Sequence, residues 1–295
     1  MCGIVGLFLK TDRLRPQLGD CLTDMLITMT DRGPDSAGIA IYGDSEAFKL
    51  TVQSDTPDLT FPAVSVWLAE NASDASLRAI DTHAVISMPE ALGETVPASL
   101  AANFPTLRIM GGGASMEIFK EVGLPKDVAD RFGIRAMSGS HGIGHTRMAT
   151  ESAVTTDGAH PFSTGADQCL VHNGSLSNHN SLRRKLAREN VTVSSQNDSE
   201  VAAAYLTWKM REGANLGQAL EAGLNDLDGF YTFVVGTKNG FGVVRDPIAC
   251  KPAVLAETDD YVAFGSEYRA LVNLPDIETA RVWEPEPATV YFWER

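Results

Sequence analysis

Cys2 combines two chemical groups that could carry out nucleophilic catalysis on one residue. It stands directly behind Met1 and directly before an apolar run, in the stretch MCGIVGLF. Removal of Met1 would leave Cys2 with both a thiol and a free α-amine. A thiol with an ordinary pKa of about 8.5 needs a base near neutral pH, and an α-amine with an ordinary pKa of about 7.7–8.0 can be that base. The alternative is that Cys2 is simply a small residue that starts a strand.

Five polar clusters further along the chain lie beside expected strands. A pocket that hydrolyses an amide needs a site for the oxyanion, a clamp for an anion and a partner for a cation. Each need has a candidate in the clusters RGPDSAG (32–38), GHTRMAT (144–150), GAHPF (158–162), VHNG (171–174) and NDSE (197–200).

Composition excludes several classes of function. The 295-residue chain has 24 basic and 38 acidic side chains and a formal charge of −14, which opposes binding to nucleic acid or to an anionic membrane. It contains no apolar stretch of about 20 residues and no secretory signal pattern, so we expect a cytoplasmic protein. Its four cysteines form no CxxC pair, so we expect neither disulfides nor a metal site.

The elements that would position these residues can be read from hydrophobic periodicity. Residues 2–9 form an apolar run typical of a buried strand, and residues 36–43 predict a second strand. Between them, apolar side chains recur at helical spacing and predict one helix that ends near Gly33. Cys21 lies on that apolar stripe, so we expect it in the core rather than in a site.

Residues 50–138 break this order and predict an elaboration inserted between two core strands, not an independent domain. The glycine run at 110–115 predicts a turn, since it lacks the lysine or the spaced glycines of a phosphate-binding loop, and 116–133 resembles a helix. From 139 onward, strands, three helices and more strands follow, with a hairpin at Asn239-Gly240. We therefore expect an α+β chain built in layers.

The clusters, taken with the MCGI start and in this order, resemble the class II glutamine amidotransferases, whose nucleophile is the N-terminal residue. The resemblance spans both ends of the chain and omits mainly residues 50–138. It implies a four-layer αββα sandwich of the N-terminal-nucleophile hydrolase type, with residues 1–295 as a single domain. It also implies a glutaminase that passes ammonia from glutamine to a synthase site.

The same resemblance assigns the catalytic residues. Cys2 corresponds to the nucleophile that attacks glutamine and forms a thioester, with its own amine as the base. Asn173 corresponds to the side chain of the oxyanion hole, and Gly174 contributes the adjacent backbone N–H. On its own, the Asn-Gly pair would indicate a tight turn.

Two charged residues correspond to those that hold the substrate. Arg147 matches the arginine that binds the α-carboxylate of glutamine, a task suited to its planar fork of donors. Asp198 matches the carboxylate that receives the α-ammonium group. The alternatives are a surface ion pair for Arg147 and a helix N-cap for Asp198.

Four further residues complete the expected pocket. Thr150 and His160 correspond to residues that line it, although His160 could equally be a hydrogen-bonded histidine of the scaffold. Arg32 and Asp35 are expected to shape the wall near the nucleophile.

The partner is expected to be a separate protein. The long segment before the Arg147 motif resembles the stand-alone glutaminase subunits of glutamate-synthase-like enzymes, including N-methylglutamate synthase. This implies a hetero-oligomer in which the synthase subunit, and not this chain, holds FMN and iron–sulfur clusters. Ala249 and Lys251 differ from the glycine and arginine common in that group, which leaves the acceptor open. The alternatives are a free-standing amidotransferase for another acceptor and a non-catalytic scaffold that senses glutamine.

Overall fold

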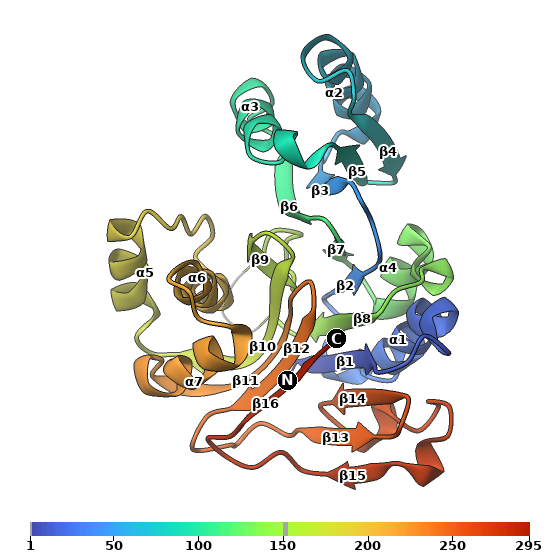
Figure 1. The fold of residues 1–295 in the computed structure, drawn as a ribbon, viewed down its shortest axis with the longest axis vertical. Coiled ribbons are helices and arrows are strands. Elements are labelled where there is room, and N and C mark those ends of the chain that lie inside the picture. Colours follow the sequence, from blue (N-terminus) through green and yellow to red (C-terminus); the bar gives the residue numbers. More distant parts are fainter. Residues whose placement is uncertain (1, 150–152) are drawn as a thin grey trace.

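The computed structural model describes residues 2–149 and 153–295, and its centre is a pair of stacked antiparallel sheets (Figure 1). The first sheet contains both the strand that follows Cys2 and the strand that ends at Arg147. Its order is β15 (Arg281–Trp283), β13 (Val254–Glu257), β14 (Tyr261–Gly265), β1 (Gly3–Leu9), β8 (His141–Arg147), β2 (Ser36–Tyr42) and β7 (Met116–Val122).

The second sheet carries the Asn173 motif on its longest strand. Its order is β16 (Val290–Glu294), β12 (Gly240–Arg245), β11 (Gly229–Gly236), β10 (Gln168–Leu176) and β9 (Phe162–Gly165). The turn between β11 and β12 closes through hydrogen bonds between Thr237 and Gly240, so the expected hairpin is confirmed.

A third sheet stands beside this pair, with two helices against it (Figure 1). Its order is β4 (Ser76–Ile80), β5 (His83–Met88), β3 (Phe48–Gln53) and β6 (Arg108–Gly113), and its helices are α2 (Pro57–Asn71) and α3 (Thr95–Asn103). The other helices are α1 (Leu18–Ile27), α4 (Pro125–Phe132), α5 (His179–Arg188), α6 (Asp198–Arg211) and α7 (Leu216–Asp226). In the described ranges, every helix is too short or too polar to span a bilayer.

Three hydrophobic clusters define four layers. One cluster joins α1 and α4 to the outer face of the first sheet, and a second joins α5, α6 and α7 to the outer face of the second sheet. A third lies between the two sheets and takes side chains from both. The expected α+β fold, a four-layer αββα sandwich, is confirmed.

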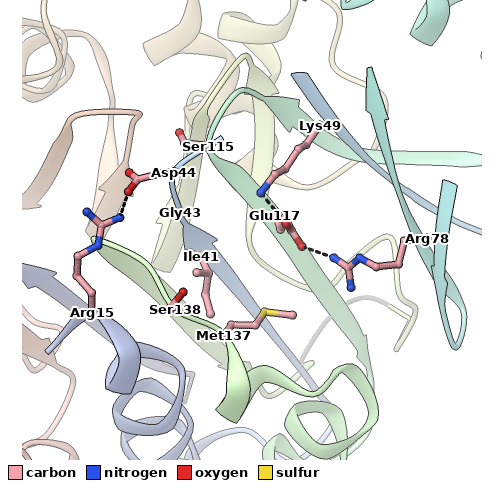
Figure 2. Close-up of a pocket in the computed structure, with 10 residues that line it drawn as sticks. All are labelled: Arg15, Ile41, Gly43, Asp44, Lys49, Arg78, Ser115, Glu117, Met137 and Ser138. Atoms are coloured by element: carbon pink, nitrogen blue, oxygen red, sulfur yellow. Dashed lines mark hydrogen bonds and ion pairs between the residues drawn. The ribbon is translucent and has the colours of Figure 1, made fainter. Parts of the chain in front are cut away.

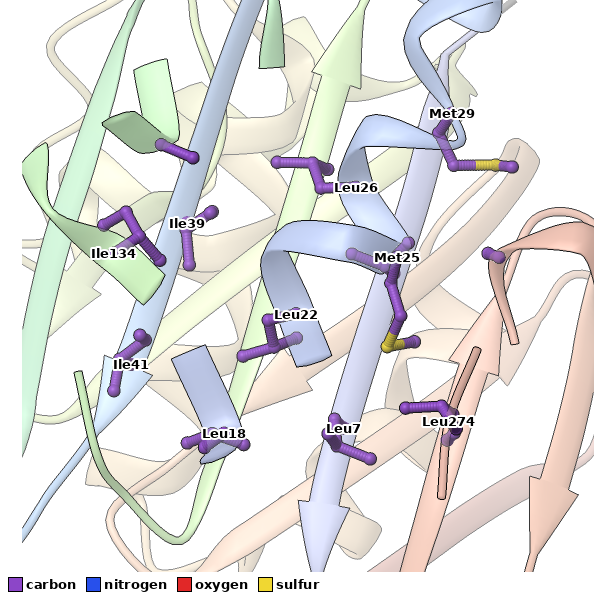
Figure 3. Packing of buried hydrophobic residues seen from close by; sticks show 14 of the residues in the cluster. Leu7, Leu18, Leu22, Met25, Leu26, Met29, Ile39, Ile41, Ile134 and Leu274 are labelled. Carbon is purple, nitrogen blue, oxygen red and sulfur yellow. The ribbon is translucent and has the colours of Figure 1, made fainter. Parts of the chain in front are cut away.

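Strand β1 is apolar along its whole length because both of its faces are buried. Successive side chains of a strand point to opposite faces. Val5, Leu7 and Leu9 accordingly pack toward α1, where Leu7 lies against the helix side chains shown in Figure 3, whereas Ile4 and Phe8 lie between the sheets. Cys21 lies at the margin of the α1 cluster and is only partly buried, so the expectation of a core position is met in part.

The expected helix over 116–133 is wrong in its first half. Residues Met116–Val122 form β7, which pairs along its length with β2, and only Pro125–Phe132 are helical. Pairing with a strand already in the sheet overrides local helix preference, because it buries the alternate side chains Met116 and Ile118 between the sheets.

The expected turn over residues 110–115 is confined to the last two of them. Gly111 and Gly112 lie inside β6 and pair with β3. A Cβ atom on Gly111 would stand 2.8 Å from Cδ1 of Ile118 and 3.0 Å from Cβ of Ser163, so neighbouring side chains occupy the space beside this glycine. The turn itself comes at Ala114 and Ser115, whose N–H groups donate to the carboxylate of Asp167.

The inserted part is narrower than the expected range of 50–138. Phe48–Gly113 form the third sheet and its helices, with a hydrophobic cluster of their own. By contrast, β7 and α4 belong to the first sheet and its outer layer. The description of the whole chain as one domain with an elaboration stays a prediction.

Candidate active site

The carbonyl group of Cys2 is held by two side chains from different parts of the chain. Arg32 donates from Nε to this oxygen at 3.0 Å, and Asn173 donates from Nδ2 at 3.2 Å. The Cys2 side chain is partly buried, and its Sγ lies 4.0 Å from the carbonyl oxygen of Met148. Cys2 therefore lies at the edge of the space between the two sheets, with its backbone carbonyl held by Arg32 and Asn173.

Arg147 lies at the same edge. Gly3 on β1 is opposite Thr146 on β8, and the two strands are antiparallel. Cys2 directly precedes Gly3 and Arg147 directly follows Thr146, so both residues lie at the same end of this strand pair. Alternation along β8 places Arg147 on the face of Ile143, which points between the sheets. The Arg147 side chain is buried, and it donates to the carbonyl of Ala153 at 3.3 Å.

Asn173 and Gly174 lie inside β10, opposite Thr232 and Tyr231 on β11, so the tight-turn alternative is wrong. Gly174 has φ +155°, and a Cβ atom there would stand 2.0 Å from the carbonyl oxygen of Phe230. Only glycine fits this position. The irregular backbone follows directly after the side chain that contacts Cys2.

Asp198 contacts β10 from the start of α6, which packs on the outer face of the second sheet. Its Oδ2 accepts a hydrogen bond from the N–H of Leu176, the last residue of β10, at 2.8 Å. The side chain keeps 22% exposure. Asp198 is the first residue of α6, whose N-cap is Asn197, accepting from the N–H of Ser199. The N-cap alternative for Asp198 is therefore wrong.

His160 is buried beside a second buried histidine, His145. Its ring stacks on His145 with a centroid distance of 4.0 Å, and His145 in turn contacts the carbonyl of His172. Burial lowers the pKa of His145 to about 3 and that of His172 to about 4, and it lowers the pKa of His160 well below its usual value. These rings are neutral near pH 7. Within the described residues, neither ring nitrogen of His160 has a hydrogen-bond partner.

Lys120 holds the loop that carries His160. Its buried amino group donates to the carbonyls of Ala159 at 2.8 Å and Pro161 at 3.3 Å, on both sides of the histidine. Burial lowers the pKa of Lys120 to about 8. No sequence motif singled out this lysine, because it lies on β7, in the stretch that was expected to be helical.

A second set of contacts was also missed from the sequence. Arg32 forms an ion pair with Glu267 at 2.5 Å, and this contact lowers the pKa of Glu267. The two residues are 235 positions apart, and the signal that could have found the pair is the polar GSE stretch (265–267) directly after an apolar strand. Asp35 accepts from the N–H of Ala149 at 2.8 Å, so Arg32 and Asp35 both support the site's backbone.

The structure thus brings Cys2, Arg147 and Asn173 to one edge of the space between the sheets, with Asp198 at the end of β10. Thr150 and Met1 lie outside the described residues. Among the residues described, no group of three or more His, Cys, Asp or Glu side chains is arranged to hold a metal ion.

Comparison with known proteins identifies the family. The model of the glutamine amidotransferase domain matches residues 128–291. A glutamine amidotransferase-like protein, GlxB of Rhizobium meliloti, is 69% identical over 100% of this chain and 98% of its own length. The chain belongs to the glutamine amidotransferase family. A putative glutamine amidotransferase of Methanothermobacter thermautotrophicus is 32% identical over 99% of both chains.

Solved structures support the same fold. The glutamine phosphoribosylpyrophosphate amidotransferase of B. subtilis superimposes with a TM-score of 0.64 over 99% of this chain, at 18% identity. The chain spans about half of that protein, 47% of its length. This glutamine amidotransferase and the B. subtilis protein therefore share a fold over the length of this chain.

Proposed function

We propose that this glutamine amidotransferase is a glutaminase whose nucleophile is the Cys2 thiol. Its α-amine accepts the thiol proton, and sulfur attacks the side-chain amide carbon of glutamine. The C–N bond then breaks, ammonia takes up that proton, and water hydrolyses the thioester to glutamate. The observation that carries the proposal is the placement of Cys2 at the edge between the sheets, with its carbonyl bound by Arg32 and Asn173.

The neighbouring residues suit the remaining steps. An asparagine amide has two N–H donors, so Asn173 can keep its contact with Cys2 and donate to the oxyanion as well. The backbone N–H of Gly174 is the second donor that we assign to this oxyanion. Arg147 binds the α-carboxylate of glutamine, Asp198 its α-ammonium group, and His160 and Thr150 line the pocket.

The fate of ammonia is a further part of the proposal. Ammonia that escapes into water near neutral pH becomes largely ammonium and ceases to be a nucleophile, so a shielded transfer is needed. We assign the acceptor to a separate synthase subunit of the glutamate-synthase-like type, such as N-methylglutamate synthase, which would hold the FMN and the iron–sulfur clusters. The resemblance of this chain to stand-alone glutaminase subunits supports that choice.

We place the docking surface for this subunit on α2. One face of the helix packs into the third sheet through Phe61, Val64 and Leu68. The opposite face is also apolar, with Leu59 76% and Val66 61% exposed. Because solvated helix faces are normally polar, an apolar second face indicates an interface.

The charge around this face indicates the kind of partner. Residues 48–113 contain seven acidic and three basic side chains. A complementary partner surface would therefore be apolar with a basic rim.

The nucleophile is tested by substitution and by mass. Cys2→Ala should abolish glutaminase activity without unfolding the protein, and Cys21→Ala, at a partly buried position in the α1 cluster, should retain activity. Active enzyme should lack Met1 by intact-mass measurement. Activity in a chain that retains Met1 would contradict the mechanism, since the Cys2 amine would then be an amide.

The partner is tested by isolating the native complex. Co-purification of a flavin and iron–sulfur protein supports the glutamate-synthase-like assignment, whereas an acceptor enzyme without these groups would support the free-standing alternative. The double variant Leu59→Glu, Val66→Glu should lose the partner and keep basal activity. Val272→Glu, at another exposed apolar position, is the matched control.

A further inference from the structure

A cavity of about 350 Å³ lies between the first sheet and the third sheet (Figure 2). Its walls come from the end of β2, from β3, β4 and β7, and from the segments before α1 and β8. Its volume is within the range of small-molecule sites.

The cavity is remote from Cys2. Strand β2 begins at Ser36, opposite Arg147, and ends at Tyr42, opposite His141. The cavity is lined by Gly43, directly after that second end. Six residues of extended strand span about 20 Å, so the cavity and the candidate active site lie at opposite ends of the same sheet.

One wall of the cavity holds two cations and a single carboxylate. Glu117 on β7 accepts from Lys49 on β3 at 2.7 Å and from Arg78 on β4 at 2.9 Å. The carboxylate neutralises one of the two cations. Arg78 donates to Glu117 from Nη2, and a guanidinium has five N–H donors, so this wall can bind another anion.

The opposite wall holds Arg15, which pairs with Asp44 at the rim (Figure 2) and, at 3.4 Å, with the exposed Asp12. The Asp44 side chain is 82% exposed, and an ion pair with so exposed a partner contributes little. A ligand carboxylate could therefore replace Asp44 at small cost. The lining has three basic and two acidic side chains, an excess of positive charge in a chain whose net charge is −14.

Between the two walls, the floor combines two apolar side chains with the hydroxyl of Ser138. Ile41 and Met137 lie there, flanked by Arg15 on one side and by Lys49 and Arg78 on the other (Figure 2). A molecule with an anionic group at each end and a short apolar middle matches this order of charges.

We propose that this cavity binds a short-chain dicarboxylate, with one carboxylate on Arg15 and the other on Arg78 and Lys49. Such a ligand would join the third sheet to the first. The proposal goes beyond the glutaminase function and does not depend on it, because no residue of the cavity belongs to the candidate active site.

The test is calorimetric titration of the full chain with glutarate. Glutarate lacks the α-amino group that we expect the active site to require, and butyrate is the matched ligand with one carboxylate. We expect saturable binding of glutarate and at least tenfold weaker binding of butyrate. Arg15→Ala and Arg78→Ala should each weaken glutarate binding at least tenfold, and Arg211→Ala, at an exposed arginine of α6, should not change it.

Asp44→Asn gives a readout that a purely structural role would not produce. Because Asp44 competes with the ligand for Arg15, its neutral replacement should bind glutarate more tightly than the unmodified chain does. Absence of glutarate binding, equal affinity for butyrate, tighter binding of inorganic phosphate, or binding unaffected by Arg78→Ala would each overturn the proposal. Folding of each variant is verified by its thermal transition.

Discussion

The side chain of Asn173, from the second sheet, donates a hydrogen bond across the interior to the carbonyl oxygen of Cys2, at the start of the first sheet. The contact couples the two sheets beside the proposed nucleophile.

Asn173→Ala should therefore reduce turnover more than binding. Removing one donor of an oxyanion hole typically lowers kcat by about 10²–10³. We expect a decrease of this size with little change in KM for glutamine, measured by glutamate release. An unchanged kcat with a raised KM would instead show that Asn173 only supports the backbone of Cys2.

Asp198→Asn tests recognition of the substrate ammonium group. The asparagine oxygen can still accept from the N–H of Leu176, so the local backbone contact is preserved. Loss of one charged hydrogen bond should raise KM about 10–100-fold. Asp58→Asn, at an exposed position of α2, is the control. Comparable turnover of glutamine and N-acetylglutamine by the unmodified enzyme would remove Asp198 from this role.

Lys120→Met tests the support of the His160 loop. The substitution keeps most of the side-chain volume and removes the donors to the carbonyls of Ala159 and Pro161. Leaving buried polar groups unpaired costs about 1–3 kcal/mol, which urea unfolding can measure. KM for glutamine should rise too, because this loop lies beside Arg147. Lys126→Met, at an exposed lysine of α4, should change stability by less than about 0.5 kcal/mol. Equal stability of the two variants would refute the role.

The buried histidines predict how stability depends on pH. Burial lowers the pKa of His83, His141 and His172 to about 4 and that of His145 to about 3. In the unfolded chain a histidine has a pKa of about 6.5, so between about pH 6.5 and 4 the unfolded state binds more protons than the folded state. The free energy of unfolding should accordingly fall as the pH falls through this window, and these histidines should add no slope above about pH 7.

Urea midpoints at several pH values measure this slope. His141→Gln should make it shallower, because one of the depressed groups is removed. A midpoint that stays constant between pH 7 and 5 would show that these rings are protonated in the folded protein.

Local patterns in the sequence were sufficient to predict an α+β chain built in layers, whereas the four-layer sandwich was predicted from the family resemblance. The apolar run before Leu9 and the order of the polar clusters could both be read directly. That residues 116–122 form a strand could not be read in this way, because the strand depends on pairing with β2, which is distant in the sequence. For the same reason, the contact of Arg32 with Glu267 became visible only after the strands were placed.

The two helices of the third sheet were also missed from the sequence. Pro- and Ala-rich segments in 57–103 hide two helices, one of which is apolar on both faces. Periodicity is a weak guide for such a helix, because it lacks the polar side that usually marks a helical pattern.

The connection between β2 and β7 has an evolutionary consequence. These strands are antiparallel neighbours, and Tyr42 lies opposite Met116, so the whole third sheet emerges from what is topologically the tip of a hairpin. The entropy of closing a loop grows only slowly with its length, so material at this tip can be enlarged, exchanged or shortened to a tight turn at little cost to the register of the first sheet. The third sheet can therefore change in evolution independently of the first. Selection could alter α2 and the cavity between the two sheets without altering β1 and β8, the strands next to Cys2 and Arg147.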